Sequence, residues 1–218
     1  MALTAKAAGE SNFTPVPQGM HLARCYRVVD LGTQKTEYQG TVKHLPKVML
    51  QFEVHGNDDN DKPILTGKGE PMSISKNFTL SLAEKATLRK DLQTWRGREF
   101  TQAELNGFEL KNVLGAWAMI SVIKAMGNNG KEYTNIATIN AVPSSMKASL
   151  PQGFNKVGLF EIENPDHEMF ETFSDNLKQK IQGSPEWKSR NGERYAKEQK
   201  ATANSGSGFD DMDSDIPF

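Results

Sequence analysis

Alternating apolar and polar positions predict three strands in the first third of the chain. Residues Leu22–Leu31 are rich in β-branched and aromatic side chains, and Met72–Leu80 alternates more weakly. Lys47–Val54 alternates most cleanly, which predicts a half-buried strand with one polar face. The apolar face of that strand would carry Val48, Leu50, Phe52 and Val54.

A helix is expected after the third strand. Ser81 and Glu84 have the spacing of a capping box, which predicts a helix that begins at Ser81. Gly97 would end this helix, because glycine readily adopts the left-handed conformation that closes a helix. Thr101 and Glu104 repeat the capping spacing and predict a shorter helix. The buried stripe of the first helix would consist of Leu88, Leu92 and Trp95.

Two more strands follow, at Val113–Ala125 and Tyr133–Val142. Turn-forming residues at Gly127–Gly130 separate them, which predicts a β-hairpin. The predicted order of three strands, a helix and two strands is that of the OB-fold, a five-stranded Greek-key barrel. The fold class is therefore predicted to be mainly β with α (α+β). An antiparallel α+β domain of another topology stays an alternative, because its element order would look similar.

The C-terminal third predicts a helical extension and a tail. Asn164 and Pro165 suit the first positions of a helix with an apolar stripe, and Ser184–Glu186 suits the start of another. These helices would pack on the barrel or on a second subunit, so a homodimer stays open. The stripe comprises Phe170, Phe173, Leu177 and Ile181. The predicted divisions are an N-terminal arm (1–18), an OB-fold nucleic-acid-binding domain (19–143), a linker and helical extension (144–200), and a tether with an acidic tip (201–218).

The net charge of the chain is close to zero because a slightly basic body and an acidic C-terminal tip offset each other. The 218 residues hold 26 Lys and Arg against 27 Asp and Glu, a net charge of −1. Without the four aspartates of the C-terminal tip, residues 1–209 hold 26 basic and 23 acidic groups, a charge of +3. Residues 201–208 are small and polar, which predicts a flexible, disordered tether before that tip.

Several kinds of chemistry are not expected. The sequence has no Gly-rich phosphate loop, its four histidines are scattered, and Cys25 has no partner, so no cofactor and no metal site is predicted. The loop with Asp58, Asp59 and Asp61 fails the EF-hand pattern, although a metal-dependent nuclease at these residues stays a rival hypothesis. We expect no enzyme, no membrane partner and a cytoplasmic location, because no apolar leader or span is found.

Single-stranded nucleic acid is bound by cations for the phosphates and by aromatic faces for the bases. OB-folds bind their ligands on the second and third strands and on the loops that join strands one to two and four to five. The predicted barrel offers both kinds of residue in or near those places. Trp117 and the tyrosines would stack on bases, and the alternative is that they belong to the core. The apolar faces of its strand favour the core for Trp117, whereas the hydroxyls of Tyr26 and Tyr133 favour a place at the surface or barrel rim. The candidate nucleic-acid-binding residues are Arg24, Tyr26, Lys35, Tyr38, Lys43, Lys47, Lys76, Trp117, Lys124, Lys131 and Tyr133.

The C-terminal residues DDMDSDIPF resemble the tip of bacterial single-stranded DNA-binding proteins, an acidic run closed by Ile-Pro-Phe. The body is more similar to phage-encoded OB-fold single-stranded DNA-binding proteins, in Leu88–Thr101, Leu110–Gly115 and Gly130–Ile136. The resemblance implies that the tip binds replication, recombination and repair proteins of host or phage. The partner-binding residues would be Asp210, Asp211, Asp213, Asp215, Ile216, Pro217 and Phe218.

The functional hypothesis is therefore a non-enzymatic, non-sequence-specific single-stranded DNA-binding protein of replication and recombination, in the cytoplasm of a bacterial host if the chain is phage-encoded. It would coat exposed strands and recruit partner enzymes through its tip. The alternative is an adaptor or decoy that occupies host repair or replication enzymes with the tip. A preference for RNA also stays open, because it depends on contacts to the 2′-hydroxyl.

Overall fold

The computed structural model describes residues 14–38, 40–126 and 132–190. Its contacts divide the chain into two compact units. Unit 1 comprises Met1–Val29 and Met49–Leu159, and unit 2 comprises Asp30–Val48 and Phe160–Phe218. This division differs from the contiguous ranges predicted above, because the first two strands continue from one unit into the other.

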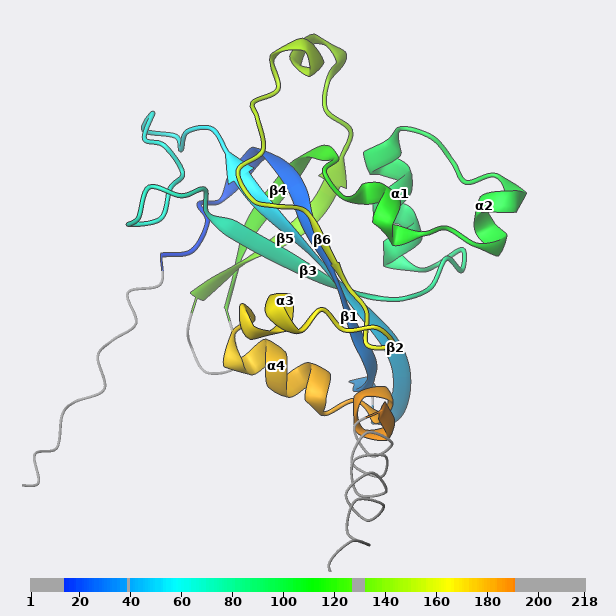
Figure 1. Cartoon of the computed structure of the whole chain (residues 1–218). Helices are drawn as coiled ribbons and strands as arrows, with labels where there is room; N and C mark the ends of the chain where they lie inside the picture. Colours follow the sequence, from blue (N-terminus) through cyan, green and yellow to red (C-terminus); the bar gives the residue numbers. More distant parts are fainter. Residues whose placement is uncertain (1–13, 39, 127–131, 191–218) are drawn as a thin grey trace, which may run out of the picture. The chain divides into compact units, whose positions relative to one another are not determined.

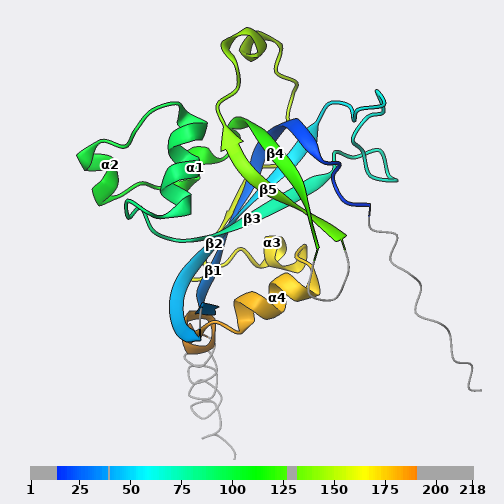
Figure 2. The same ribbon diagram turned by 180° about the vertical axis from the view of Figure 1, so that it is seen from behind.

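An antiparallel sheet dominates the structure and, with a few helices, makes it an α+β protein (Figure 1, and from behind in Figure 2). The order of its main path is β3-β2-β1-β4-β5, and the short β6 pairs with β1. In the described residues this path is open and ends at β3 and β5, so the sheet does not close on itself. The strands are β1 (Gly19–Tyr38), β2 (Thr41–His55), β3 (Ser73–Thr79), β4 (Trp117–Met126), β5 (Glu132–Asn140) and β6 (Gly158–Phe160).

β1 to β5 lie where the hydrophobic pattern predicts strands, but β1 and β2 are much longer than predicted, and β6 was not predicted. The prediction that one face of β2 is exposed is wrong in unit 1, where Met49 and Glu53 are buried as well as Leu50 and Phe52. Both faces are covered because a later loop crosses the polar face, which alternation within the strand cannot reveal. The predicted hairpin is confirmed, since β4 and β5 pair antiparallel, while its turn lies outside the described residues.

Helix α1 (Thr87–Arg96) begins later than predicted. Ser81 is not its N-cap, because the Ser81 hydroxyl instead accepts a hydrogen bond from the amide of Ala83 in a local turn. The N-cap is Ala86, which provides no side-chain cap. The predicted stripe of Leu88, Leu92 and Trp95 is buried, and Gly97 ends the helix with a φ of 67°. The remaining helical elements of unit 1 are α2 (Gln102–Asn106), with the predicted Thr101–Glu104 capping box, and the 3₁₀ turns η1 (Leu110–Val113) and η2 (Ser144–Ser149).

A lysine bridges the two open edges of the sheet in unit 1. The ammonium of Lys76 in β3 lies 2.7 Å from a carboxylate oxygen of Asp91 in α1 and donates a hydrogen bond of 2.9 Å to the carbonyl of Ala137 in β5. Beneath α1, the rings of Phe52 and Trp95 pack 5.5 Å apart. Lys76 and α1 therefore connect β3 with β5, which form no ladder with each other in the described residues.

Unit 2 has a core of aromatic rings. Phe160 and Phe170 stack at 5.7 Å, and Phe170 stacks on Trp187 at 4.7 Å. The predicted apolar stripe is largely buried, but it lies on two helices, α3 (His167–Glu171) and α4 (Asp175–Gln182), and not on one. The prediction of Asn164 as N-cap is wrong, because the side chain of Asp166 caps α3. Ser174 breaks the predicted helix, since its hydroxyl caps α4.

The second helical start in the extension is confirmed. Residues 185–190 are helical, and the Ser184 hydroxyl accepts a hydrogen bond from the amide of Trp187. Glu186 accepts two hydrogen bonds from Thr33, one from its amide at 2.9 Å and one from its hydroxyl at 2.5 Å. None of the helices in the described part of the chain has the length and apolar character that a membrane crossing requires.

Candidate nucleic-acid interface

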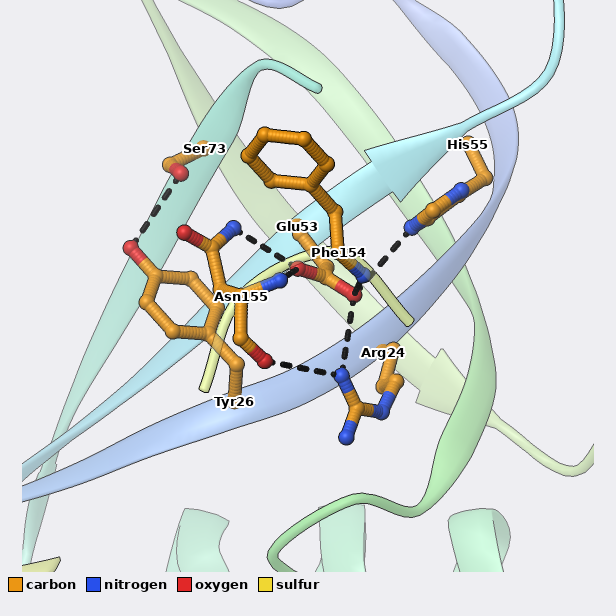
Figure 3. A network of polar contacts seen from close by, with 7 residues as sticks. All are labelled: Arg24, Tyr26, Glu53, His55, Ser73, Phe154 and Asn155. Atoms are coloured by element: carbon orange, nitrogen blue, oxygen red, sulfur yellow. Dashed lines mark hydrogen bonds and ion pairs between the residues drawn. The ribbon is translucent and has the colours of Figure 1, made fainter. Parts of the chain in front are cut away.

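A fully buried carboxylate, that of Glu53, joins β2 to a later loop of unit 1 (Figure 3). It lies on the face of the sheet opposite to Phe52, which we call the outer face of unit 1. Glu53 accepts hydrogen bonds from the amides of Phe154 (2.9 Å) and Asn155 (2.6 Å) and from the Asn155 side chain (2.7 Å). We call residues 150–157 the strap, because Glu53 fastens this segment across β2. Burial is the largest influence on the pKa of Glu53 and would raise it, but the combined hydrogen bonds outweigh burial and lower the pKa.

Arg24 belongs to the same network and lies under the strap. Its Nη1 donates to a Glu53 oxygen at 3.2 Å and to the carbonyl of Asn155 at 3.1 Å (Figure 3). Gly153 lies so close that a Cβ at this position would be 1.8 Å from Nη1. The guanidinium that the sequence assigned to phosphate binding is thus engaged within the protein in this structure, and its role in nucleic-acid binding stays a prediction.

Tyr26 is buried in unit 1. The hydroxyl lies 3.2 Å from that of Ser73 in β3 (Figure 3), and burial raises the pKa of Tyr26. Lys76 is engaged in the ion pair between β3 and α1 described above. Both side chains carry out structural tasks that the strand pattern did not reveal.

Trp117 stands directly opposite Arg24 in the pairing of β1 with β4. Its indole is half-buried, and His55 packs against it in an edge-on contact with ring centroids 4.9 Å apart. His55 in turn lies 3.2 Å from the Glu53 carboxylate (Figure 3). The structure therefore brings together three of the predicted residues, Arg24, Tyr26 and Trp117, on the outer face of unit 1, next to the strap.

The other predicted residues lie in separate places. Lys35 and Lys43 are exposed in unit 2, where Lys47 is half-buried. Lys124 forms an exposed ion pair of 2.9 Å with Glu132, and Tyr133 is 41% exposed in β5. The side chain of Tyr38, together with Lys131 and the partner-binding residues Asp210, Asp211, Asp213, Asp215, Ile216, Pro217 and Phe218, lies outside what the structure describes.

A cavity of about 590 Å³ lies between α1, η1 and η2 and is lined in part by Trp117, and we call it the α1–η1 cavity. Its walls combine aromatic and apolar side chains with three cations and one carboxylate. The indole nitrogen of Trp95 donates a 2.8 Å hydrogen bond to the carbonyl of Trp117, which fixes one wall. The residues that give the cavity its chemistry are Arg96, Arg98, Glu104, Phe108, Trp117 and Lys147.

One carboxylate holds both arginines of this cavity in place. Glu104 accepts from Arg98 at 2.7 and 3.0 Å and from Nη2 of Arg96. Hydrogen bonds from Arg98 and then from the Thr101 amide lower the pKa of Glu104 to about 2. The Arg96 guanidinium lies over the rings of Phe100 and Phe108, 4.5 and 5.0 Å from their centroids. Cationic and aromatic groups are therefore preorganised side by side.

Sequence patterns did not predict this cavity, because its residues come from five elements and from the loops between them. One signal was present, since two arginines flank the helix-ending Gly97 directly after Trp95. A left-handed glycine reverses the chain, so residues on its two sides can approach the same ligand. Lys147 and Phe108 gave no such signal, because they stand in segments with no periodic pattern.

The acidic loop shows local turn chemistry. The carboxylate of Asp58 accepts hydrogen bonds of 2.9 Å from the amides of Asn60 and Lys62. Within residues 14–38, 40–126 and 132–190, no three acidic, histidine or cysteine side chains are grouped to hold a metal ion.

Comparison of this chain with models of known protein families and with the sequences of curated proteins finds no match.

Proposed function

We propose that this protein binds single-stranded DNA without sequence specificity, on an OB-fold formed by unit 1, during replication or recombination. The observation that carries the proposal is the strand order β3-β2-β1-β4-β5 with α1 between β3 and β4. This is the order of a five-stranded Greek-key barrel of the OB type, which is often partly open. Lys76 and α1 span the open side, where β3 and β5 would meet.

The outer face of unit 1 offers the chemistry that such binding requires. Trp117 presents a half-buried indole beside His55, and Arg24 lies opposite it on β1. Phe154 of the strap is 57% exposed and adds a second aromatic side chain at this face. Stacking of a base on an aromatic ring contributes about 1 to 3 kcal/mol and tolerates any sequence. The acidic tip, by its resemblance, would recruit replication, recombination and repair enzymes.

A binding titration tests the proposal. Fluorescence anisotropy would compare single-stranded DNA of about 30 nucleotides with 5′-hydroxyl ends, the matched duplex and the matched RNA. We expect the single strand to bind more tightly than the duplex, with an affinity that falls between roughly 50 and 200 mM salt. A preference for duplex would refute the proposal.

The adaptor or decoy hypothesis keeps one observation in its favour, since the strap engages Arg24 and the core buries Tyr26. Fewer groups are then free for nucleic acid on this face than the sequence predicted. No binding of any nucleic acid at the lower salt concentration, together with protein capture that depends on the tip, would favour this second function.

A further inference from the structure

The α1–η1 cavity has the size and the groups of a site for a small anionic ligand. Its volume of about 590 Å³ falls within the range of ligand pockets, roughly 300 to 1,000 Å³. All of its lining residues belong to unit 1. In addition, Nη1 of Arg96 is buried and has no hydrogen-bond partner among the described residues. Such a nitrogen is uncommon in folded proteins, because most buried polar groups are hydrogen-bonded.

The charges of the cavity indicate what that acceptor is. Arg96, Arg98 and Lys147 contribute three positive charges and Glu104 one negative charge, which leaves an excess of two. A phosphate monoester carries roughly −1.5 to −2 at neutral pH, whereas a phosphodiester within a strand carries a single charge. Planar guanidinium groups also suit the geometry of phosphate oxygens. The excess therefore matches a terminal phosphate better than an internal one.

The remaining walls suit a planar ring. Phe108 and Trp117 line the cavity, and Val113, Val142 and Leu150 add apolar surface. Phe108 is held by an edge-on contact with Phe100, with centroids 5.2 Å apart. A nucleobase attached to the phosphate would replace water on these surfaces and stack on an aromatic face. Inorganic phosphate would leave them unused.

We propose that the α1–η1 cavity binds a nucleotide with a terminal phosphate, either free or at the end of a DNA strand. The strand-end form rests on the proposed function, and the free form does not. Glu104 has a positioning role, since it holds the two arginines that meet the phosphate. Lys147 is exposed at the edge of the cavity and would contribute the third cation.

Calorimetric titration of the full chain tests the proposal with deoxyadenosine 5′-monophosphate, deoxyadenosine and inorganic phosphate. We expect the monophosphate to bind at least about tenfold more tightly than either other compound, because each lacks one half of the recognised groups. Lys147→Gln should weaken monophosphate binding about tenfold by removing one charged hydrogen bond. Lys90→Gln is the matched control, since Lys90 is exposed on α1 and does not line the cavity.

Equal affinity for the monophosphate and deoxyadenosine, or an equal effect of Lys147→Gln and Lys90→Gln, would overturn the proposal. Short strands of about six nucleotides with a 5′-phosphate, a 3′-phosphate or no phosphate distinguish the two sources of the ligand. Tighter binding of a phosphorylated strand supports the strand-end form, and binding of the free monophosphate alone supports the free form. If the protein binds no hydroxyl-ended DNA at all, the proposed function is refuted. The proposal that the α1–η1 cavity binds a nucleotide would still stand.

Discussion

Glu53 shows how one side chain can organise a loop about 100 positions away. A buried carboxylate is costly unless its oxygens are satisfied, and here five hydrogen-bond donors from Arg24, His55, Phe154 and Asn155 meet them. The sequence placed Glu53 on a polar, exposed face of its strand. Only the strap accounts for its burial, and no pattern in residues 150–157 announces that contact.

Glu53→Gln should lower the free energy of unfolding by about 3 kcal/mol at neutral pH, because an amide cannot replace a carboxylate toward so many donors. The pKa of Glu53 is lower in the folded protein than its ordinary value of 4.5. Its contribution is therefore fully present above pH 4.5 and is lost as the pH falls through the folded pKa. Urea unfolding at about pH 7 and about pH 3 measures both effects.

The control for that experiment is Glu84→Gln, since Glu84 is exposed in the turn before α1. We expect this control to change the free energy of unfolding by less than about 0.5 kcal/mol. A difference between the wild-type protein and Glu53→Gln that stays constant from neutral to acid pH would contradict the assignment of Glu53 as a stabilising carboxylate.

The start of α1 illustrates what local patterns can and cannot predict at the scale of an element. The buried stripe and the ending glycine were predicted correctly, because helical spacing and a positive φ are properties of the segment itself. The start was wrong because the Ser81 hydroxyl is used in a turn that precedes the helix. The helix instead begins at Thr87, and its N-cap Ala86 provides no side-chain cap.

Ala86→Ser should therefore raise the free energy of unfolding by about 1 kcal/mol. Ala86 already has the extended backbone of an N-cap, with φ −69° and ψ 132°, and its carbonyl accepts the first helical hydrogen bond from Lys90. A serine hydroxyl there would accept from a free amide of the first turn. Chemical denaturation measures the change, and Ala83→Ser, outside the helix, provides the matched control. An equal effect of both substitutions would exclude a capping mechanism.

At the scale of the whole molecule, the order of strands could be predicted from the sequence and the assembly of the site could not. Alternation and turn residues locate each strand, but cross-strand register decides that Arg24 faces Trp117. The ion pair of Lys76 with Asp91 joins segments that no local pattern connects. The α1–η1 cavity draws on residues from Trp95 to Leu150, so it exists only once unit 1 has folded.

The separation of charge between the body and the tip leads to a prediction for the complete chain. Deletion of Phe218 should leave affinity for single-stranded DNA unchanged or raised, because unit 1 supplies the proposed binding face. The same deletion should abolish capture of replication and repair enzymes, since a terminal aromatic carboxylate is the anchor that the resemblance implies. Anisotropy and pull-down from bacterial extract, each with the full chain as control, measure the two effects. Loss of DNA binding on this deletion would contradict the division of tasks.

The 20-residue strand β1 constrains how the gene can change. Its residues up to Val29 belong to unit 1 and those from Asp30 onward to unit 2. A single codon inserted at this boundary would turn every later side chain of the strand to the opposite face, so the fully buried Leu31 would point outward. It would also move Gly32, where a Cβ would lie 2.5 Å from that of Ser184. We therefore expect insertions or deletions within β1 to be tolerated when they comprise two codons, which preserve the alternation of its side chains, or when they fall in the turn after the strand. Because both units share β1, a change of its length in one unit affects the other.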